Sequence, residues 1–429
     1  MAASRDRSMR LQDAERLLLS LELFGMRFGL DRMRRLLTAL GSPQERFGSI
    51  HVVGTNGKSS TVRMTAAILR RHGLHTGAYL SPHLVSFTER VRVDDADASG
   101  PAFAAAIQRA AVAAEKVDRK APADDHVTQF ELLTAAAFDL FARANVEVAV
   151  VEAGLGGRFD ATNVLPSKVA VLTNVGLEHT RWLGPTVHDI ATEKLDVVEP
   201  DSTLVVGHGL HPDARALAET TARDRHATLV EAPADPGVEL EMLARGAFQR
   251  RNFAEAVEAA RAYLATLGRD LDPDAVIAAA ASTLVPGRFE VVGERGGRAE
   301  VVLDGAHNPG GLAALAETLP EFVAGRRLVA CLAVLDDKDA TAMLRTLLPL
   351  CDAVVTTRAG TPRALPPATL ASLCHQLGYA GTVEIVGEAR AALERARALA
   401  GADGVALATG SIYLIADLLR PAGAARSTL

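Results

Sequence analysis

The sequence predicts an α/β protein of two domains, each built on a parallel sheet covered by helices, with the second domain smaller and Rossmann-like. The chain has 429 residues, which is too long for one ordinary core. Short β-branched runs alternate with helical apolar patterns along most of it. The stretch at 286–297, PGRFEVVGERGG, mixes turn residues with charge. We therefore expect domains at 1–290 and 291–429.

Composition excludes several protein classes. Hydrophobic residues make up 48% and charged residues 23%, the balance of a globular enzyme. A net charge of −6, without basic tracts, gives no reason to expect nucleic acid. No segment resembles a signal peptide or a bilayer span, so we expect a cytoplasmic protein without membrane contact. Cys331, Cys351 and Cys374 are too widely spaced for a zinc site or a disulfide framework.

The N-terminal part predicts a helical cap followed by a strand, a glycine turn and a helix. Helical stripes cover Asp13–Leu23 and Leu30–Leu40. Ile50–Val53 then reads as a strand, and helical spacing begins at Ser60.

The turn between this strand and helix, Gly54-Thr55-Asn56-Gly57-Lys58-Ser59, is a shortened P-loop, since Val52 stands where the full pattern needs glycine. Its glycines let backbone N–H groups face an anion, and the helix N-terminus adds further donors. Lys58 would contact the terminal phosphates, and Ser59 or Ser60 a magnesium ion. Asn-Gly also favours a β-hairpin, but the residues after Lys58 predict a helix rather than a second strand.

Polar residues follow several predicted strands, at the sheet edge where open α/β proteins bind ligands. Thr76–Leu80 ends at Ser81, and Val146–Val151 is followed by Glu152, the position from which P-loop proteins hold magnesium. Glu152 could instead be a solvated loop acid. Lys168–Leu172 leads to His179, which on its own is a weak signal, and Lys194 would lie in a helix as part of an exposed charged pair.

Further helices and strands complete the prediction. Helices are expected at 101–116, 128–142, 246–267, with Asn252 near its start, and 272–284. In the second domain we expect strands at 301–303, 328–335, 353–356, 383–386 and 405–408, and helices at 311–319, 341–348, 367–377, 390–400 and 412–419. The strand ends there carry Asp304, His307, Asn308, Gly410 and Ser411.

An ordered series of motifs is similar to those of the bacterial dihydrofolate synthase/folylpolyglutamate synthase family, in the Mur ligase superfamily. The motifs are GTNGK, SPHL followed by TERVRV, TQFE, VVEAGLGGRFDATN, EHT, ATEK, PGRFE, LDGAHNP and LAVLDDKD. They cover nearly the whole chain, so the match is far more specific than a lone P-loop.

The resemblance implies an ATP-dependent ligase that joins L-glutamate to dihydropteroate or to the γ-carboxylate of a folate through an acyl phosphate. Residues 1–290 would form a Mur-ligase-type ATP-binding domain with a helical cap, and 291–429 a glutamate-ligase domain. The implied cofactors are ATP and Mg²⁺ at two sites, with room for K⁺. The implied partners are these small substrates alone, bound by a monomer.

Site residues follow from the same resemblance by matching motifs. The resemblance assigns Lys58, Glu152, His179 and Lys194 to catalysis; Thr55 to Ser60, Asn252, Arg288 and Asp304 to ATP; and Ser81 and Glu152 to the first metal. It assigns His179 and a carbamylated Lys194 to the second metal, and Pro82, His83, Arg158, His307 and Ser411 to substrate.

Several positions depart from the family pattern. Ser59 and Glu178 replace a glycine and an aspartate, Leu195-Asp196 replace Ala-Gly, and the stretch 201–247 is short. These departures leave open a ligase of the superfamily with another carboxylate acceptor. A non-catalytic nucleotide-binding regulator is the third hypothesis, although it would have little need for Ser81, Glu152, His179 and Lys194 together.

Overall fold

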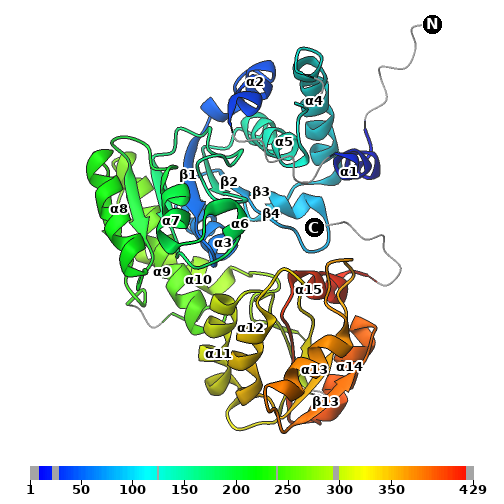
Figure 1. Cartoon of the computed structure of the whole chain (residues 1–429). Helices are drawn as coiled ribbons and strands as arrows, with labels where there is room; N and C mark the ends of the chain where they lie inside the picture. Colours follow the sequence, from blue (N-terminus) through cyan, green and yellow to red (C-terminus); the bar gives the residue numbers. More distant parts are fainter. Residues whose placement is uncertain (1–8, 22–28, 123–124, 238–239, 293–298, 422–429) are drawn as a thin grey trace, which may run out of the picture. The chain divides into compact units, whose positions relative to one another are not determined.

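The computed structural model describes residues 9–21, 29–122, 125–237, 240–292 and 299–421 of the chain. Its contacts divide it into two compact units. The first comprises Met1–Glu241 and Arg251–Thr283, and the second Met242–Arg250 and Leu284–Leu429. Each unit has its own sheet with mostly parallel strands, which confirms the predicted α/β class (Figure 1).

The sheet of the first unit has eight strands in the order β4-β3-β2-β5-β1-β6-β7-β8. The neighbours are parallel along the series β2, β5, β1, β6, β7 and β8. At the other edge, β3 pairs antiparallel with β2, and β4 pairs antiparallel with β3. The bounds are β1 (Gly48–Val53), β2 (Thr76–Tyr79), β3 (Val91–Val93), β4 (Ala96–Asp97), β5 (Val148–Glu152), β6 (Val169–Leu172), β7 (Thr203–Val206) and β8 (Thr228–Glu231).

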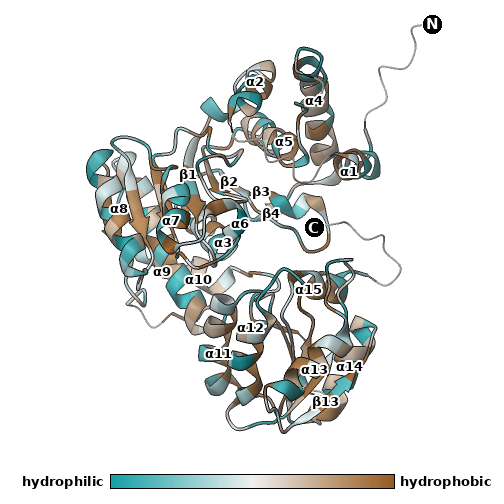
Figure 2. Cartoon of the chain, in the orientation of Figure 1, coloured by the Kyte–Doolittle hydropathy of each residue, from teal (hydrophilic) through white to brown (hydrophobic). Residues whose placement is uncertain are grey.

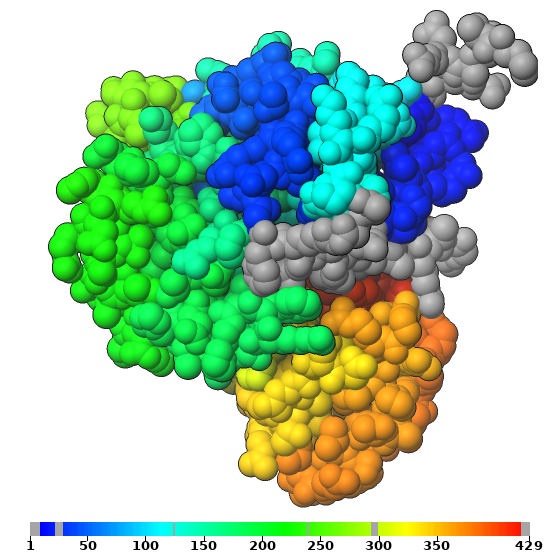
Figure 3. All heavy atoms as spheres, turned by 45° about the horizontal axis from the view of Figure 1, so that its top comes forward, coloured from blue at the N-terminus to red at the C-terminus, as the bar shows by residue number. Residues whose placement is uncertain are grey.

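Helices cover this sheet on both faces. Ala149 and Val151 of β5 join a core with α1 (Leu11–Ser20), α2 (Asp31–Ala39), α4 (Gly100–Asp118) and α5 (Gln129–Arg143). Because side chains alternate along a strand, the other face of β5 is turned to α3 (Lys58–Arg71), which contacts β1, β2 and β5. Figure 3 shows the blue N-terminal helices beside the cyan segment that includes α4.

The remaining elements of the first unit are η1 (Pro43–Glu45), η2 (Phe87–Arg90), α6 (Thr180–Leu183), α7 (Val187–Leu195), α8 (Pro212–Asp224), α9 (Ala247–Thr266) and α10 (Pro273–Ser282). The first residues of α9 belong by contact to the second unit. The predicted helix at Asp13–Leu23 is present as α1, which ends at Ser20, and residues 22 and 23 lie outside the described part.

The sheet of the second unit has the order β13-β12-β11-β14-β10-β9. Its strands are β9 (Glu290–Val292), β10 (Glu300–Leu303), β11 (Leu328–Leu332), β12 (Ala353–Thr356), β13 (Thr382–Ile385) and β14 (Val405–Thr409). Its helices are α11 (Pro309–Val323), α12 (Ala340–Leu347), η3 (Leu348–Leu350), α13 (Pro367–Gln376), α14 (Ala389–Ala400) and α15 (Ile412–Leu419).

The segment at 286–297, where the sequence predicts the domain boundary, contains β9. This strand pairs antiparallel with β10, with Val291 opposite Val302. The second sheet is therefore not wholly parallel. Residues 293–297 lie outside the described part of the chain.

The hydropathy of the residues agrees with the arrangement of sheets covered by helices. The strand ribbons are mostly apolar, and charged residues gather on the outer faces of the helices (Figure 2). In β5 and β11 every residue is buried, as expected for central parallel strands covered on both faces. Among the helices that the structure describes, none combines the length and apolarity needed to span a bilayer.

Candidate active site

The predicted nucleotide loop joins β1 to α3. β1 ends at Val53, and α3 begins at Lys58, two residues earlier than the sequence suggested. Gly54 and Gly57 have φ angles of 152° and 86°, which side chains rarely tolerate. Helix α3 therefore begins at Lys58, and the N–H groups of Lys58, Ser59 and Ser60 in its first turn have no partner within the helix. An anion site at a helix N-terminus requires N–H groups of this kind.

The end of β6 holds this loop in place. The Asn174 carbonyl accepts from the Thr55 N–H at 3.0 Å, and the Asn174 side chain accepts from the Asn56 N–H at 2.9 Å. The Thr173 hydroxyl donates to the Asn56 carbonyl at 2.6 Å. Sequence reasoning did not assign Thr173 or Asn174 to the site. Their position at the carboxyl end of a central parallel strand is the feature of the sequence that could have identified them as site residues.

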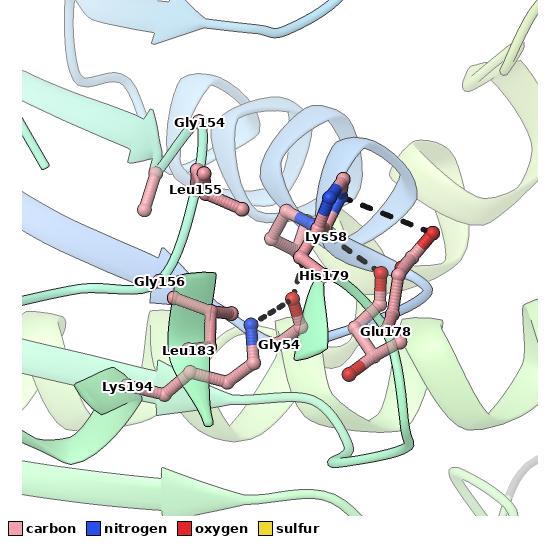
Figure 4. A pocket seen from close by; sticks show the side chains of 11 residues that line it. Gly54, Lys58, Gly154, Leu155, Gly156, Glu178, His179, Leu183 and Lys194 are labelled. Atoms are coloured by element: carbon pink, nitrogen blue, oxygen red, sulfur yellow. Dashed lines mark hydrogen bonds and ion pairs between the residues drawn. The ribbon is translucent and has the colours of Figure 1, made fainter. Parts of the chain in front are cut away.

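Two lysine amines converge on one carbonyl oxygen at the start of the loop. Lys58 and Lys194 donate to the Gly54 carbonyl at 3.0 Å and 2.8 Å (Figure 4). Lys194, on α7, is 5% exposed. Burial, together with the smaller effect of the Lys58 charge, lowers the pKa of its amine to about 7, and the charges of Glu178 and Asp160 oppose this shift. The sequence suggested an exposed charged pair at Lys194, and the structure instead encloses this amine.

Glu152 joins three elements at the carboxyl edge of the sheet. It is the last residue of β5 rather than the first residue after it, and its carboxylate is buried. The Ser59 hydroxyl donates to its two oxygens at 3.0 and 2.8 Å, and the Ser81 N–H donates to Oε2 at 3.1 Å. The site thus gathers one carboxylate and two serines, all oxygen donors of the kind that Mg²⁺ prefers.

His179 lines a small hollow beside the nucleotide loop. Its side chain is 44% exposed, and Nε2 lies 4.0 Å from Oε1 of Glu178. The backbone at His179 is left-handed, with φ 53°, at the start of α6. The cavity is lined by Gly54, Thr55, Lys58, Ala153, Gly154, Leu155, Gly156, Glu178, His179, Leu183 and Lys194. The structure thus brings Lys58, His179 and Lys194 to one hollow, as Figure 4 shows.

The glycine-rich loop after β5 packs too tightly for side chains. A Cβ on Gly154 would lie 2.6 Å from the Phe130 ring, and one on Gly157 would lie 2.5 Å from the Glu193 carbonyl oxygen. Arg158 also contacts α7, since its guanidinium lies 3.1 Å from Glu193 and 3.7 Å from Asp196. Arg158 therefore flanks Lys194 instead of extending freely toward a substrate.

A buried polar chain ties this loop to β1. Asp160 accepts from the Leu155 N–H at 2.8 Å and from the Thr162 N–H at 3.0 Å. The Thr162 hydroxyl lies 2.8 Å from Nε2 of His51. Burial lowers the pKa of His51 to about 3, so the ring is neutral at physiological pH. None of these three was a predicted site residue.

Three further predicted residues have different surroundings. Pro82 is exposed. His83 is 1% exposed, accepts from Nε of Arg90 at 2.9 Å, and has its ring centre 4.4 Å from that of Phe87. Asn252, at the start of α9, is buried against the nucleotide loop, because a Cβ on Gly57 would lie 2.5 Å from its Oδ1.

The residues of the second unit that the sequence assigned to the site lie at the ends of strands β9, β10 and β14. Asp304 is buried and accepts from the Phe289 and Ala306 N–H groups at 2.8 Å each. Burial raises the pKa of Asp304, and the charge of Arg288 acts against that shift. Nδ1 of His307 lies 2.9 Å from the Gly305 carbonyl oxygen. Ser411 caps α15 by accepting from the Tyr413 N–H at 3.2 Å.

Two family models match the chain. Residues 52–226 match the Mur ligase middle domain, and residues 287–412 match the glutamate ligase domain of Mur ligases. The two matches cover the nucleotide loop, the cavity residues and the second sheet.

Similar proteins agree with these matches. A dihydrofolate synthase/folylpolyglutamate synthase of Mycobacterium tuberculosis is 36% identical over 80% of this chain and 76% of its own. A probable bifunctional folylpolyglutamate synthase/dihydropteroate synthase of Haloferax volcanii is 36% identical over 95% of this chain, which spans only 50% of that relative's length. The structure of a Mycobacterium tuberculosis folylpolyglutamate synthase complexed with ADP superposes with a TM-score of 0.86 at 32% identity, covering 95% of this chain and 97% of that one.

Proposed function

The chain belongs to the dihydrofolate synthase/folylpolyglutamate synthase family of Mur ligases, and we propose that it is an ATP-dependent ligase that joins L-glutamate to dihydropteroate or to the γ-carboxylate of a folate. The observation that carries this proposal is the meeting of Lys58, His179 and Lys194 around the nucleotide loop. ATP use is further supported by the related folylpolyglutamate synthase, which was solved with ADP.

The reaction needs activation because a carboxylate is a poor electrophile. An oxygen of the acceptor carboxylate attacks the γ-phosphorus of ATP, and ADP leaves. The glutamate amine then attacks the acyl carbon of the acyl phosphate, the carbon–oxygen bond to phosphate breaks, and an amide and phosphate are formed. Lys58 and the N–H groups at the start of α3 stabilise the charge that moves between the phosphates, from positions fixed before the reaction.

The residues present fit magnesium. Ser81 and Glu152 would hold one ion, and His179 with a carbamylated Lys194 would hold a second. Mg²⁺ is commonly held by one or two carboxylates and by substrate phosphates, so the Glu152 carboxylate and the phosphates of ATP would supply most of its ligands. When bound, such ions neutralise charge on the phosphates. A K⁺ ion is allowed by the resemblance alone.

The remaining site roles rest on motif matching and on the contacts described above. We assign the loop from Thr55 to Ser60 and Asn252 to the nucleotide, because Asn252 lies against Gly57. Arg288 and Asp304 are assigned to the nucleotide by resemblance. The assignment of Pro82, His83, Arg158, His307 and Ser411 to substrate also rests on resemblance.

The organisation of the whole protein is part of this proposal. Residues 1–290 would act as the ATP-binding domain with its helical cap, and 291–429 as the glutamate-ligase domain. We further propose a cytoplasmic monomer whose partners are its small substrates, since a net charge of −6 gives nucleic acid no electrostatic attraction.

A screen of acceptors and donors tests the proposal. With ATP and Mg²⁺, phosphate release should be fast only when L-glutamate and dihydropteroate or tetrahydrofolate are both present, and amide should form in equal amount. The Lys58→Ala variant should be folded but inactive, because its amine stabilises phosphoryl transfer. Lys168→Ala is the matched control, since Lys168 is exposed and precedes β6.

Other outcomes of this screen would indicate a different function. Clear preference for a different carboxylic acid would leave a Mur-type ligase with another acceptor. Phosphate release that is equally fast without acceptor and glutamate would mean an ATPase, and no turnover with any acceptor would favour a nucleotide-binding regulator.

A further inference from the structure

The side-chain amide of Asn174 pairs with both backbone polar groups of one residue in the nucleotide loop. Its Oδ1 accepts from the Asn56 N–H at 2.9 Å, and its Nδ2 donates to the Asn56 carbonyl at 3.0 Å. The two bonds run in opposite directions between the same two residues, as they do between paired residues of neighbouring antiparallel strands. The amide therefore fixes both peptide groups that flank the Cα of Asn56.

Further bonds extend this pairing along the loop. The Thr55 N–H donates to the Asn174 carbonyl at 3.0 Å. The Thr55 hydroxyl accepts from the Gly176 N–H at 3.0 Å and donates to the Gly176 carbonyl at 3.3 Å. Residues 174–176 thus lie alongside the loop and hold it at several points.

The Asn56 carbonyl is the point at which the pairing is most sensitive to a change of side chain. It accepts from Nδ2 of Asn174 and from the Thr173 hydroxyl, and a carbonyl oxygen has two lone pairs for such bonds. Thr173 is buried and Asn174 is partly buried, so loss of a donor here is costly. A second acceptor in the place of Nδ2 would face the carbonyl oxygen and repel it.

The fixed carbonyl also sets the direction of the next N–H group. The Asn56 carbonyl and the Gly57 N–H belong to one planar peptide group, in which they point in opposite directions. Gly57 has φ 86° and directly precedes the first turn of α3, where the proposed phosphate site begins. A rotation of the Asn56 carbonyl would therefore turn a donor at the start of that site.

We propose that Asn174 is a positioning residue for the nucleotide: its side-chain amide holds the Asn56 carbonyl and thereby directs the N–H groups of the loop toward the phosphates. Asn174 acts through the loop and not by contact with the substrates. This inference rests on the proposed function, since it assumes that the loop binds ATP.

The test compares the parent with Asn174→Asp by calorimetry of ADP binding to the full-length protein, from pH 8 to pH 5.5 at fixed free Mg²⁺. The new carboxylate keeps the acceptor for the Asn56 N–H but replaces the donor by a second acceptor. At pH 8 the variant should bind ADP about tenfold more weakly than the parent, or weaker still, because the ionised group repels the Asn56 carbonyl.

This deficit relative to the parent should shrink as the pH falls. A protonated carboxyl has nearly the shape of the amide and can donate to the Asn56 carbonyl while it accepts from the Asn56 N–H. The facing carbonyl raises the pKa of the new carboxyl, because it disfavours the ionised form. In the parent the groups that these hydrogen bonds join to Asn174 are uncharged, so the pairing itself does not titrate.

Matched variants separate the hydrogen bonds from the effect of charge. Asn174→Leu has a similar size but no polar group, so its deficit relative to the parent should be the same at every pH. It also gives the test a readout if Asn174→Asp folds poorly. Gln376→Glu makes the same change from amide to acid at an exposed position of α13 and should behave as the parent. In steady-state assays, both Asn174 variants should raise the KM for ATP and leave the KM for L-glutamate unchanged.

The outcomes distinguish the inference from the proposed function. ADP affinity equal to the parent's in Asn174→Leu, or a deficit in Asn174→Asp that does not shrink at low pH, would overturn the role of Asn174 and leave the ligase assignment intact. An equal rise of both KM values would do the same, because it would indicate a general loss of structure. Failure of the parent to bind ADP at any pH would overturn the nucleotide site and this inference with it.

Discussion

Lys194 illustrates how one residue acquires an unusual chemistry from its surroundings. Its amine is enclosed between the nucleotide loop and α7, and burial together with the charge of Lys58 lowers its pKa to about 7. A lysine in water has a pKa near 10.4 and is almost wholly a cation. A substantial neutral fraction is the form that can attack CO₂ to give a carbamate, and the carbamate would supply an anionic oxygen beside His179.

We expect Lys194→Ala to lose most ligase activity, on the order of 100-fold or more, the scale of removing a group that stabilises transition-state charge. Short carboxylates such as formate or acetate should restore part of it by occupying the space of the carbamate. The parent should slow when CO₂ is removed from the buffer. Lys116→Ala, an exposed change on α4, is the control. Full activity of Lys194→Ala would remove Lys194 from the mechanism.

Some residues of the proposed site could be predicted from local sequence. Ser81 and Glu152 were proposed because each lies at the end of a predicted parallel strand, and Lys58 because it follows the glycine turn. His179 also needed the family resemblance. The residues that support them were not predicted. Asn174 contacts Asn56 across 118 positions of sequence, and Thr173 contacts it across 117, so no local spacing reveals either pair.

At the scale of elements, β1, the nucleotide loop and α3 depend on glycines that act for different reasons. Gly57 and Gly73, which lie on either side of α3, have nearly the same φ angles, 86° and 83°. A Cβ on Gly57 would lie 2.5 Å from Asn252, whereas nothing lies within 4 Å of one on Gly73. An alanine would therefore strain the backbone to a similar degree at both positions, but only Gly73 has space for its side chain.

This pair gives a prediction. Gly73→Ala should lower the free energy of unfolding by about 1 kcal/mol, because alanine disfavours positive φ. Gly57→Ala should lower it by at least as much, because its Cβ would also meet Asn252. Only Gly57→Ala should also weaken ADP binding, by about tenfold or more, because Asn252 and the loop must move apart. Urea unfolding and calorimetry measure the two effects. Equal ADP affinity in both variants would contradict the described packing.

The elements that sequence reasoning missed are short and depend on distant partners. The long helices and buried parallel strands were predicted within a few residues. β3, β4 and β9 were not, since each has only two or three residues and, apart from Val91, these are partly buried or exposed. Val291 forms a strand because β10 offers an edge to pair with, and the turn residues around it concealed that pairing.

On the scale of the whole molecule, the chain consists of two compact units, each with a sheet whose strand ends carry polar residues. The first unit supplies the nucleotide loop and the cavity. The second carries Asp304, His307 and Ser411 at its strand ends and matches the glutamate ligase domain. The reaction that we propose has two stages, phosphorylation of a carboxylate and its capture by an amine.

Isotope transfer tests this chemistry most directly. Dihydropteroate, or a folate, with both oxygens of the reacting carboxylate labelled with ¹⁸O is incubated with the protein, ATP, Mg²⁺ and L-glutamate, and the phosphate is examined by mass spectrometry. An acyl phosphate requires one ¹⁸O in phosphate for each amide formed, because the bridging oxygen leaves with phosphorus. Amide formation with unlabelled phosphate, or phosphate release without amide, would contradict the account.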